Sequence, residues 1–124
     1  MAYSSAVALT IYDIIRAGTL ATKNMVAPTA THGNKILNDG KTFLYVVNGS
    51  GSPITVTINT PNTVDGVAIA ELVVSIAATG DAGGADKKFI GPFTTIFNQS
   101  DGYVWAVCSA VGTVTIGAFR LANP

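Results

Sequence analysis

The sequence predicts an all-β protein, and three observations support this prediction. In residues 55–60, small hydroxyl residues alternate with β-branched apolar ones, and Pro53 and Pro61 bound the segment. A similar alternation returns in residues 113–116. A period of two places alternate side chains on opposite faces of a strand, so both segments are expected to be half-buried strands with uncharged outer faces. The 13 glycines in 124 residues indicate frequent turns.

Turn signals divide the chain into about eight expected strands. Many short strands separated by turns are typical of a β-sandwich or a jelly-roll-like fold. A chain of 124 residues has the usual length of one domain and can bury its own core. We therefore expect a single β domain over residues 1–124, with Trp105 on either face of its strand. The expected core centres on Leu9, Ile11, Phe43, Tyr45, Val56, Ile58, Val104, Val114 and Ile116.

The N-terminal part contains one expected strand and then a long irregular segment. Residues 6–12 place Val7, Leu9 and Ile11 on one face of a strand. The periodic pattern then disappears over residues 16–39, where Gly, Pro, Thr, Ala and Asn are frequent. Irregular segments of this length are usually functional or mobile. Two alternatives remain open: an arm that becomes ordered on a partner, or a loop that covers the end of a sandwich.

The middle of the chain predicts a central strand and a hairpin. Residues 42–48 are apolar on both faces, which favours a strand with neighbours on either side. The Gly-containing residues 48–52 then predict a hairpin connection to the strand that follows. Residues 67–77 fit either a strand or a short helix, and their β-branched part, residues 73–76, favours a strand.

The C-terminal part predicts two short segments and a final hairpin. Residues 87–92 are restricted to an edge or a bend because proline cannot donate a ladder hydrogen bond. We expect a further short strand over residues 94–97. Residues 103–109 and 112–121 are two apolar segments separated by a short turn, and we expect them to pair as a hairpin.

Charge is low and balanced. Only 11% of the residues are charged, and seven basic residues balance seven acidic ones. Zero net charge argues against nucleic-acid binding, which needs a basic surface. No apolar run approaches the roughly 20 residues of a membrane helix, and residues 1–6 show no signal peptide. The uncharged surface that remains is better suited to packing against other protein than to catalysis.

Chemistry-bearing residues are few and scattered. His32, the only histidine, lies in a flexible sequence context, whereas a catalytic base must be held in place. Cys108 is the only cysteine, lies in an apolar strand and is expected to be a buried structural thiol. Asp81 and Asp86 share a Gly-rich loop but lack the spacing of a calcium loop, and Glu71, the only glutamate, has no facing carboxylate. We expect no catalytic residue, no metal, no cofactor and no enzymatic activity.

Four segments in order carry a resemblance to a known family: residues 38–44, 48–53, 60–66 and 89–93. This order resembles small proteins encoded beside the major capsid protein of tailed bacteriophages, which are head decoration or auxiliary capsid proteins. The resemblance extends roughly over residues 38–121. It implies a virion protein on the capsid surface, assembled in the host cytoplasm, with the major capsid protein as its partner and no catalytic residues.

The expected function is therefore that of a capsid decoration or cement protein on the outer surface of the head. Self-association is expected, with a trimer favoured, and neither nucleic acid nor membrane is an expected partner. Two alternatives are another virion subunit, of the tail or head–tail connector, and a carbohydrate-binding β-sandwich module that uses Trp105 and the tyrosines. The expected contact with the shell or with other subunits lies in residues 16–39. Its candidates are Lys23, Asn24, Met25, Val26, Pro28, Thr31 and His32.

Overall fold

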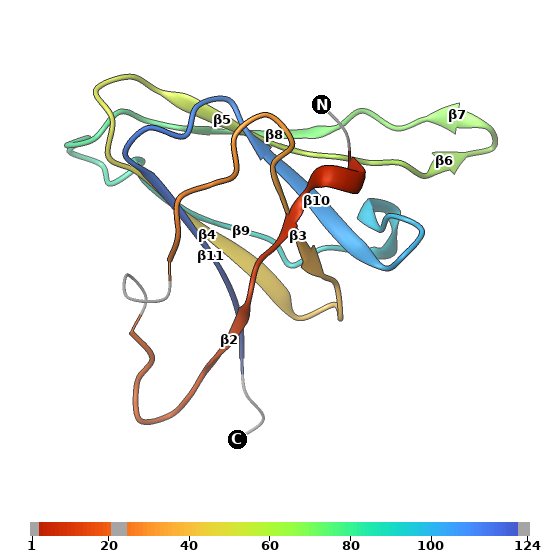
Figure 1. The fold of residues 1–124 in the computed structure, drawn as a ribbon, viewed down its shortest axis with the longest axis horizontal. Coiled ribbons are helices and arrows are strands. Elements are labelled where there is room, and N and C mark those ends of the chain that lie inside the picture. Colours follow the sequence, from red (N-terminus) through yellow and green to blue (C-terminus); the bar gives the residue numbers. More distant parts are fainter. Residues whose placement is uncertain (1–2, 21–24, 122–124) are drawn as a thin grey trace.

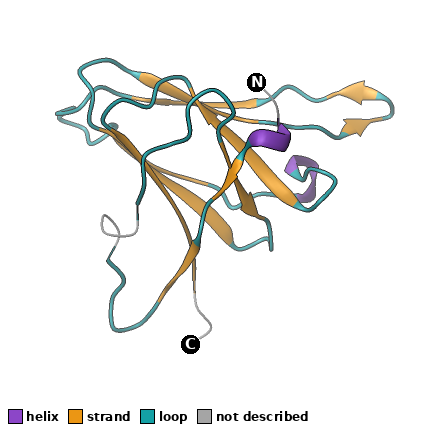
Figure 2. Cartoon of the chain, viewed as in Figure 1, coloured by secondary structure: helices purple, strands orange, loops and turns teal. Residues whose placement is uncertain are grey.

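The computed structural model describes residues 3–20 and 25–121, and this part of the chain is almost entirely β (Figures 1 and 2). The strands form two larger sheets and one small hairpin. The five-stranded sheet has the order β1 (Val7–Ala8), β3 (Asn34–Leu37), β10 (Tyr103–Cys108), β5 (Ile54–Ile58) and β8 (Leu72–Ile76). The four-stranded sheet has the order β2 (Ile11–Ile14), β11 (Val114–Leu121), β4 (Thr42–Asn48) and β9 (Lys87–Ile90).

The remaining elements are short. The hairpin consists of β6 (Thr63–Val64) and β7 (Val67–Ala68), which projects beyond the two larger sheets (Figure 1). Two 3₁₀ helices, η1 (Tyr3–Ser5) and η3 (Thr95–Phe97), complete the described elements. Both larger sheets are mixed, because β1 runs parallel to β3 and β2 runs parallel to β11. The all-β prediction is confirmed, but the described residues form eleven strands, where about eight were expected.

The two larger sheets share one hydrophobic core. In both β4 and β5, every second side chain is buried, and the apolar members of the two buried sets belong to the same cluster. Leu9 and Ile11 are only partly buried and pack against this cluster. The predicted core positions that the structure buries are Val56, Ile58, Val104, Val114 and Ile116.

The predicted burial of Phe43 and Tyr45 is wrong. Leu44 and Val46 fill the core instead, and the two aromatic side chains lie on the outer face of the four-stranded sheet. There they meet Phe89 of β9: the Tyr45 ring stacks on it at 4.6 Å between centroids, and the Phe43 ring contacts it edge-on at 5.6 Å. Because β4 is apolar on both faces, its sequence does not distinguish the face that turns inward. The predicted interior position of β4 is confirmed, since β11 and β9 pair with it on either side.

Both predicted hairpins are wrong, because the chain passes between the sheets at these turns. Strand β4 belongs to the four-stranded sheet and β5 to the five-stranded one, and β10 and β11 are likewise separated. The buried Asn48 side chain explains the first crossing. Its amide donates to the carbonyl oxygens of Ser52 and Ala77 and accepts from the Ser50 amide. These bonds hold the loop across the end of the core.

Other boundaries also differ from the prediction. Residues 6–12 do not form one strand: β1 joins the five-stranded sheet and β2 the four-stranded sheet. Residues 67–77 divide into β7 and β8, and residues 95–97 form η3 rather than a strand. The predicted strand in residues 73–76 and the edge position of β9 are confirmed.

The segment 16–39 is not irregular throughout, because it contains β3. Val26 also forms an antiparallel bridge with Ile116. Asn34 anchors the approach to β3: its side chain is buried, donates to the Val7 carbonyl and accepts from the Thr29 amide. Residues 21–24 lie outside the described part of the chain.

Candidate functional site

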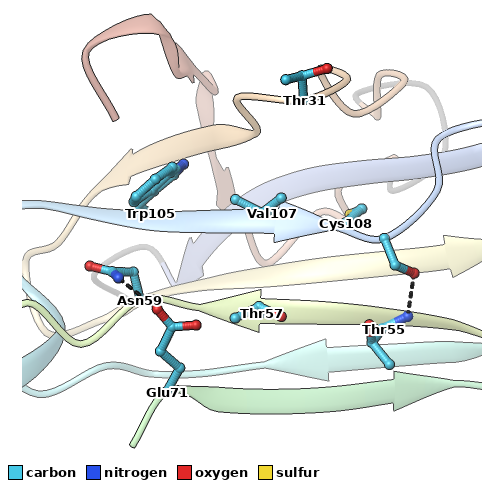
Figure 3. Close-up of a pocket in the computed structure, with 9 residues that line it drawn as sticks. Thr31, Thr55, Thr57, Asn59, Glu71, Trp105, Val107 and Cys108 are labelled. Atoms are coloured by element: carbon cyan, nitrogen blue, oxygen red, sulfur yellow. Dashed lines mark hydrogen bonds between the residues drawn. The ribbon is translucent and has the colours of Figure 1, made fainter. Parts of the chain in front are cut away.

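One candidate binding site is an open pocket of about 570 Å³ on the outer face of the five-stranded sheet. We call it the Trp105 pocket. Figure 3 shows its floor on the adjacent strands β5 and β10, with Thr31 and Glu71 on opposite sides. Because Val56 and Ile58 point into the core, the alternate residues of β5 face the pocket. The lining residues that matter below are Thr55, Thr57, Asn59, Glu71, Trp105 and Val107.

Trp105 lies on the outer face of β10, because Val104 and Ala106 are buried on the inner one. Two contacts hold its ring. The indole N–H donates to the carbonyl oxygen of His32 at 2.7 Å, and the Tyr3 ring meets the indole edge-on at 5.7 Å between centroids. The indole nitrogen is therefore engaged within the protein, and the ring supplies the pocket mainly with apolar surface.

The polar end of the pocket is held by a short chain of side-chain hydrogen bonds. Gln99 donates to the Asn59 side-chain oxygen at 2.6 Å. The Asn59 amide in turn donates to Oε1 of Glu71 at 2.9 Å. This arrangement orients the Glu71 carboxylate (Figure 3). Within the described part of the chain, Glu71 Oε2 has no hydrogen-bond partner.

Two hydroxyl groups on the pocket floor are also available. The side-chain hydroxyls of Thr55 and Thr57 make no hydrogen bond to any described residue. They lie on the same face of β5, about 7 Å apart at the usual strand rise. Of the described lining residues, Glu71 alone carries a charge at neutral pH. The pocket therefore combines apolar ring surface with hydroxyl groups and one carboxylate.

Cys108 lies at the end of β10 beside this pocket and packs partly against the core. Burial raises the pKa of its thiol from 9.0 to about 11. A thiol with a raised pKa is a poor nucleophile at neutral pH, because the thiolate is the reactive form. This environment agrees with the structural role expected from the sequence.

The structure does not gather the predicted contact residues of segment 16–39 on one surface. Met25 and Pro28 are buried, and Val26 is exposed but bridged to Ile116. Thr31 is exposed at the Trp105 pocket, and His32 lies beside it, half-buried. The remaining candidates, Lys23 and Asn24, lie outside the described residues.

The candidate calcium residues are engaged in their own loop. The Asp81 carboxylate accepts from the amides of Gly83 and Ala85. Asp86 is buried; burial alone would raise its pKa, but hydrogen bonds from Lys87 and the Gly80 amide lower it. Residues 3–20 and 25–121 contain no cluster of three or more His, Cys, Asp or Glu side chains arranged to hold a metal ion.

Two features with a bearing on function were missed by the sequence analysis. The aromatic side chains of Phe43, Tyr45 and Phe89 form a patch on the outer face of the four-stranded sheet, and Phe89 is 68% exposed. The second feature is the projecting β6–β7 hairpin, in which residues 61–68 are all exposed. Its turn is marked in the sequence by Asp65 and Gly66, both with positive φ, which is a usual hairpin signal.

The comparisons supply no relative: no family model, curated protein or solved structure matches this chain. In the described ranges, no helix has the length and apolar character needed to cross a membrane.

Proposed function

We propose that this protein is a structural component of a phage virion that binds the outer surface of the head as a decoration or cement protein. Its two sheets, which share one core, would form a β-sandwich of the jelly-roll-like kind. The proposal includes assembly in the host cytoplasm, the major capsid protein as partner, and self-association, with a trimer favoured. The resemblance of the sequence to phage decoration proteins implies the capsid as the binding partner. Two exposed surfaces, described below, support a role in assembly.

The projecting β6–β7 hairpin is the observation that carries the proposal. Its base is fixed, because the Asn62 amide donates to the carbonyl oxygens of Thr95, Ile96 and Asn98. Its tip is apolar and unsupported, with Val64 58% exposed and Val67 67% exposed. An isolated two-stranded hairpin is marginally stable in water. Burial of each valine against a partner would contribute up to about 1.5–3 kcal/mol, which suits an arm that contacts another protein.

The edge strands β9 and β8, one from each larger sheet, provide a second argument. Edge strand β9 carries Lys87 and Lys88, and charge is a common protection of an edge against further pairing. Edge strand β8 has the sequence Leu-Val-Val-Ser-Ile without a charged residue, and Val73 is 57% exposed. An unprotected edge of this kind is suited to a partner strand. We therefore assign the hairpin and the β8 edge as the assembly surfaces.

Co-sedimentation tests the proposal directly. Purified protein is mixed with shells of the major capsid protein that lack it, and the shells are pelleted. Wild-type protein is expected to pellet with the shells, and the double substitution Val64→Asp, Val67→Asp is expected to lose most of this binding. Val7→Asp, at a comparably exposed valine on the other edge of the five-stranded sheet, is the matched control. A wild-type protein that stays in the supernatant contradicts the proposal.

Imaging of virions distinguishes the proposed role from the alternative virion role. Density for this protein repeated over the head surface is the expected result. Density confined to the tail or to the head–tail connector contradicts a decoration role and favours the other structural subunit.

A further inference from the structure

The assembly surfaces proposed above leave the Trp105 pocket unused. Its floor lies on β5 and β10, which are interior strands of the five-stranded sheet. The backbone of β5 is paired with β10 on one side and with β8 on the other. A polypeptide strand therefore cannot add to the floor by main-chain pairing, and recognition there depends on side chains.

The side chains at this floor have two different chemical characters. The Trp105 ring and Val107 provide apolar surface, and the indole N–H already donates to His32. Thr55 and Thr57 offer hydroxyl groups with unused hydrogen-bonding capacity in the described part of the chain. A ligand that matches this floor needs an apolar face and several polar groups around its rim.

The charge of the pocket limits the ligand further. Glu71 is the charged residue among the described lining side chains, and its Oε2 has a free acceptor position there. An anionic ligand would be repelled by this carboxylate with no cation nearby in the lining to compensate. A carboxylate accepts hydrogen bonds strongly from neutral hydroxyl groups. The chemistry therefore favours an uncharged ligand that is rich in hydroxyl groups.

We propose that the Trp105 pocket binds a neutral carbohydrate chain. A pyranose ring has an apolar C–H face, which would pack on the indole, and equatorial hydroxyl groups, which would bond to Glu71 and Thr57. The hydrogen bond from Asn59 to Glu71 holds the acceptor in place before binding, which reduces the entropy cost of ordering it. The volume of about 570 Å³ lies within the usual range for small-molecule sites. This inference does not depend on the capsid role.

Trp105 is the only tryptophan of the chain, so its fluorescence reports directly on the pocket. The protein is titrated with cellohexaose, xylohexaose, maltohexaose and chitohexaose, and with oligogalacturonate as an anionic comparison. At least one neutral oligosaccharide is expected to cause a saturable change in emission, confirmed by calorimetry, and oligogalacturonate is expected to cause none. A printed array of neutral glycans extends the search beyond these four chains.

Substitutions that hardly change side-chain size test the assigned contacts without creating a cavity. Glu71→Gln keeps a carbonyl acceptor for Asn59 and removes the charge, and it is expected to weaken binding roughly 10- to 100-fold. Thr57→Val removes one hydroxyl and is expected to weaken binding roughly 2- to 10-fold. Thr115→Val, on the outer face of the other sheet, is the matched control and is expected to bind as the wild type.

Three outcomes overturn the inference. The first is the absence of binding to every neutral glycan on the array and in solution. The second is binding that Glu71→Gln and Thr57→Val leave unchanged. The third is equal binding of oligogalacturonate, since this would contradict the charge argument. Failure of the protein to pellet with capsid shells would contradict the proposed function and leave the glycan result standing.

Discussion

Tyr3 and Asp101 are 98 positions apart in the sequence, and the Tyr3 hydroxyl lies 2.6 and 2.7 Å from the two carboxylate oxygens of Asp101. This contact ties η1 to the turn that precedes β10. The Tyr3 ring also packs against Trp105, and the Lys35 ammonium lies over the Tyr3 ring, 5.2 Å from its centroid. The Trp105 side chain at the pocket is therefore supported by Tyr3, which is itself fixed by the turn before β10.

Removal of the Tyr3 hydroxyl should lower stability. In Tyr3→Phe the ring against Trp105 remains and the hydrogen bond to a charged carboxylate is lost. Because Asp101 is exposed, solvent screening limits the expected loss in the free energy of unfolding to about 1 kcal/mol. Urea denaturation measures it. Tyr12→Phe is the control, since the Tyr12 hydroxyl has no hydrogen-bond partner among the described residues, and a loss of equal size there would contradict the assignment.

The same contact predicts a pH window. The hydrogen bond from Tyr3 lowers the pKa of Asp101 below 3.8, so its stabilisation is fully present above 3.8 and is lost as the pH falls through the lowered value. Burial, and then the hydrogen bond to Asp101, raise the pKa of Tyr3 above 10.0. Its stabilisation is fully present below 10.0 and is lost as the pH rises through the raised value.

The stability difference between wild type and Tyr3→Phe should therefore be constant between these limits. It is expected to shrink in acid below 3.8 and in alkali above 10.0. Thermal unfolding of both proteins across this range measures the difference. A difference that is the same at every pH would show that Tyr3 acts through its ring alone.

The orientation of β4 predicts unequal costs for two truncations. Leu44 is fully buried, so Leu44→Ala should cost about 2–5 kcal/mol of unfolding free energy. Phe89 is a larger side chain but is mostly exposed, so Phe89→Ala should cost less than about 1.5 kcal/mol. Chemical denaturation of both variants checks this order. The reverse order would mean that the aromatic face of β4 is the buried one.

The unprotected edge of β8 predicts that an added charge on this strand would weaken self-association of the protein. A lysine at an exposed edge position opposes pairing with another strand, because a close partner would have to desolvate the charge. Val73→Lys should therefore reduce the mass of the purified protein toward one chain by light scattering, with little change in its unfolding temperature. Val7→Lys in the two-residue strand β1 should leave the mass unchanged. A wild-type protein that is already a single chain at high concentration contradicts the trimer.

The burial of Cys108 predicts that its thiol reacts slowly with alkylating reagents. With a pKa of about 11, roughly a thousandth of the thiol is ionised at pH 8. Iodoacetamide should therefore alkylate the folded protein roughly 100-fold more slowly than the protein unfolded in urea, where the pKa returns to its ordinary value. Mass spectrometry over time measures both rates. Equal rates would show that the thiol is freely accessible.

Strand alternation was predictable from the sequence where one face is polar. In β5, Thr55 and Thr57 alternate with Val56 and Ile58, and the structure buries the apolar set. Strand β4 has apolar residues on both faces, so the sequence predicted the strand but not which face turns toward the core. A single strand carries no information on which apolar face meets the other sheet, because this depends on the facing layer.

The connections between strands were the least predictable feature. The loop after β4 has the residues of a tight hairpin, yet it crosses to the other sheet. The reason is the buried Asn48 amide, which bonds to Ala77, 29 positions away. Such an anchor has no local pattern, since it satisfies the backbone of a distant segment.

For the candidate site, too, some features follow from the sequence and others only from the tertiary structure. By itself, the sequence determined the period-two strands, the low and balanced charge, and a single tryptophan within an apolar strand. Only the tertiary structure decided that Trp105 faces outward and that Glu71 lies across β5 from it. Periodicity is a property of neighbouring residues, whereas the pairing of Val107 with Thr57 is set by long-range contacts between strands. The pocket exists because that pairing brings the side chains together on one face.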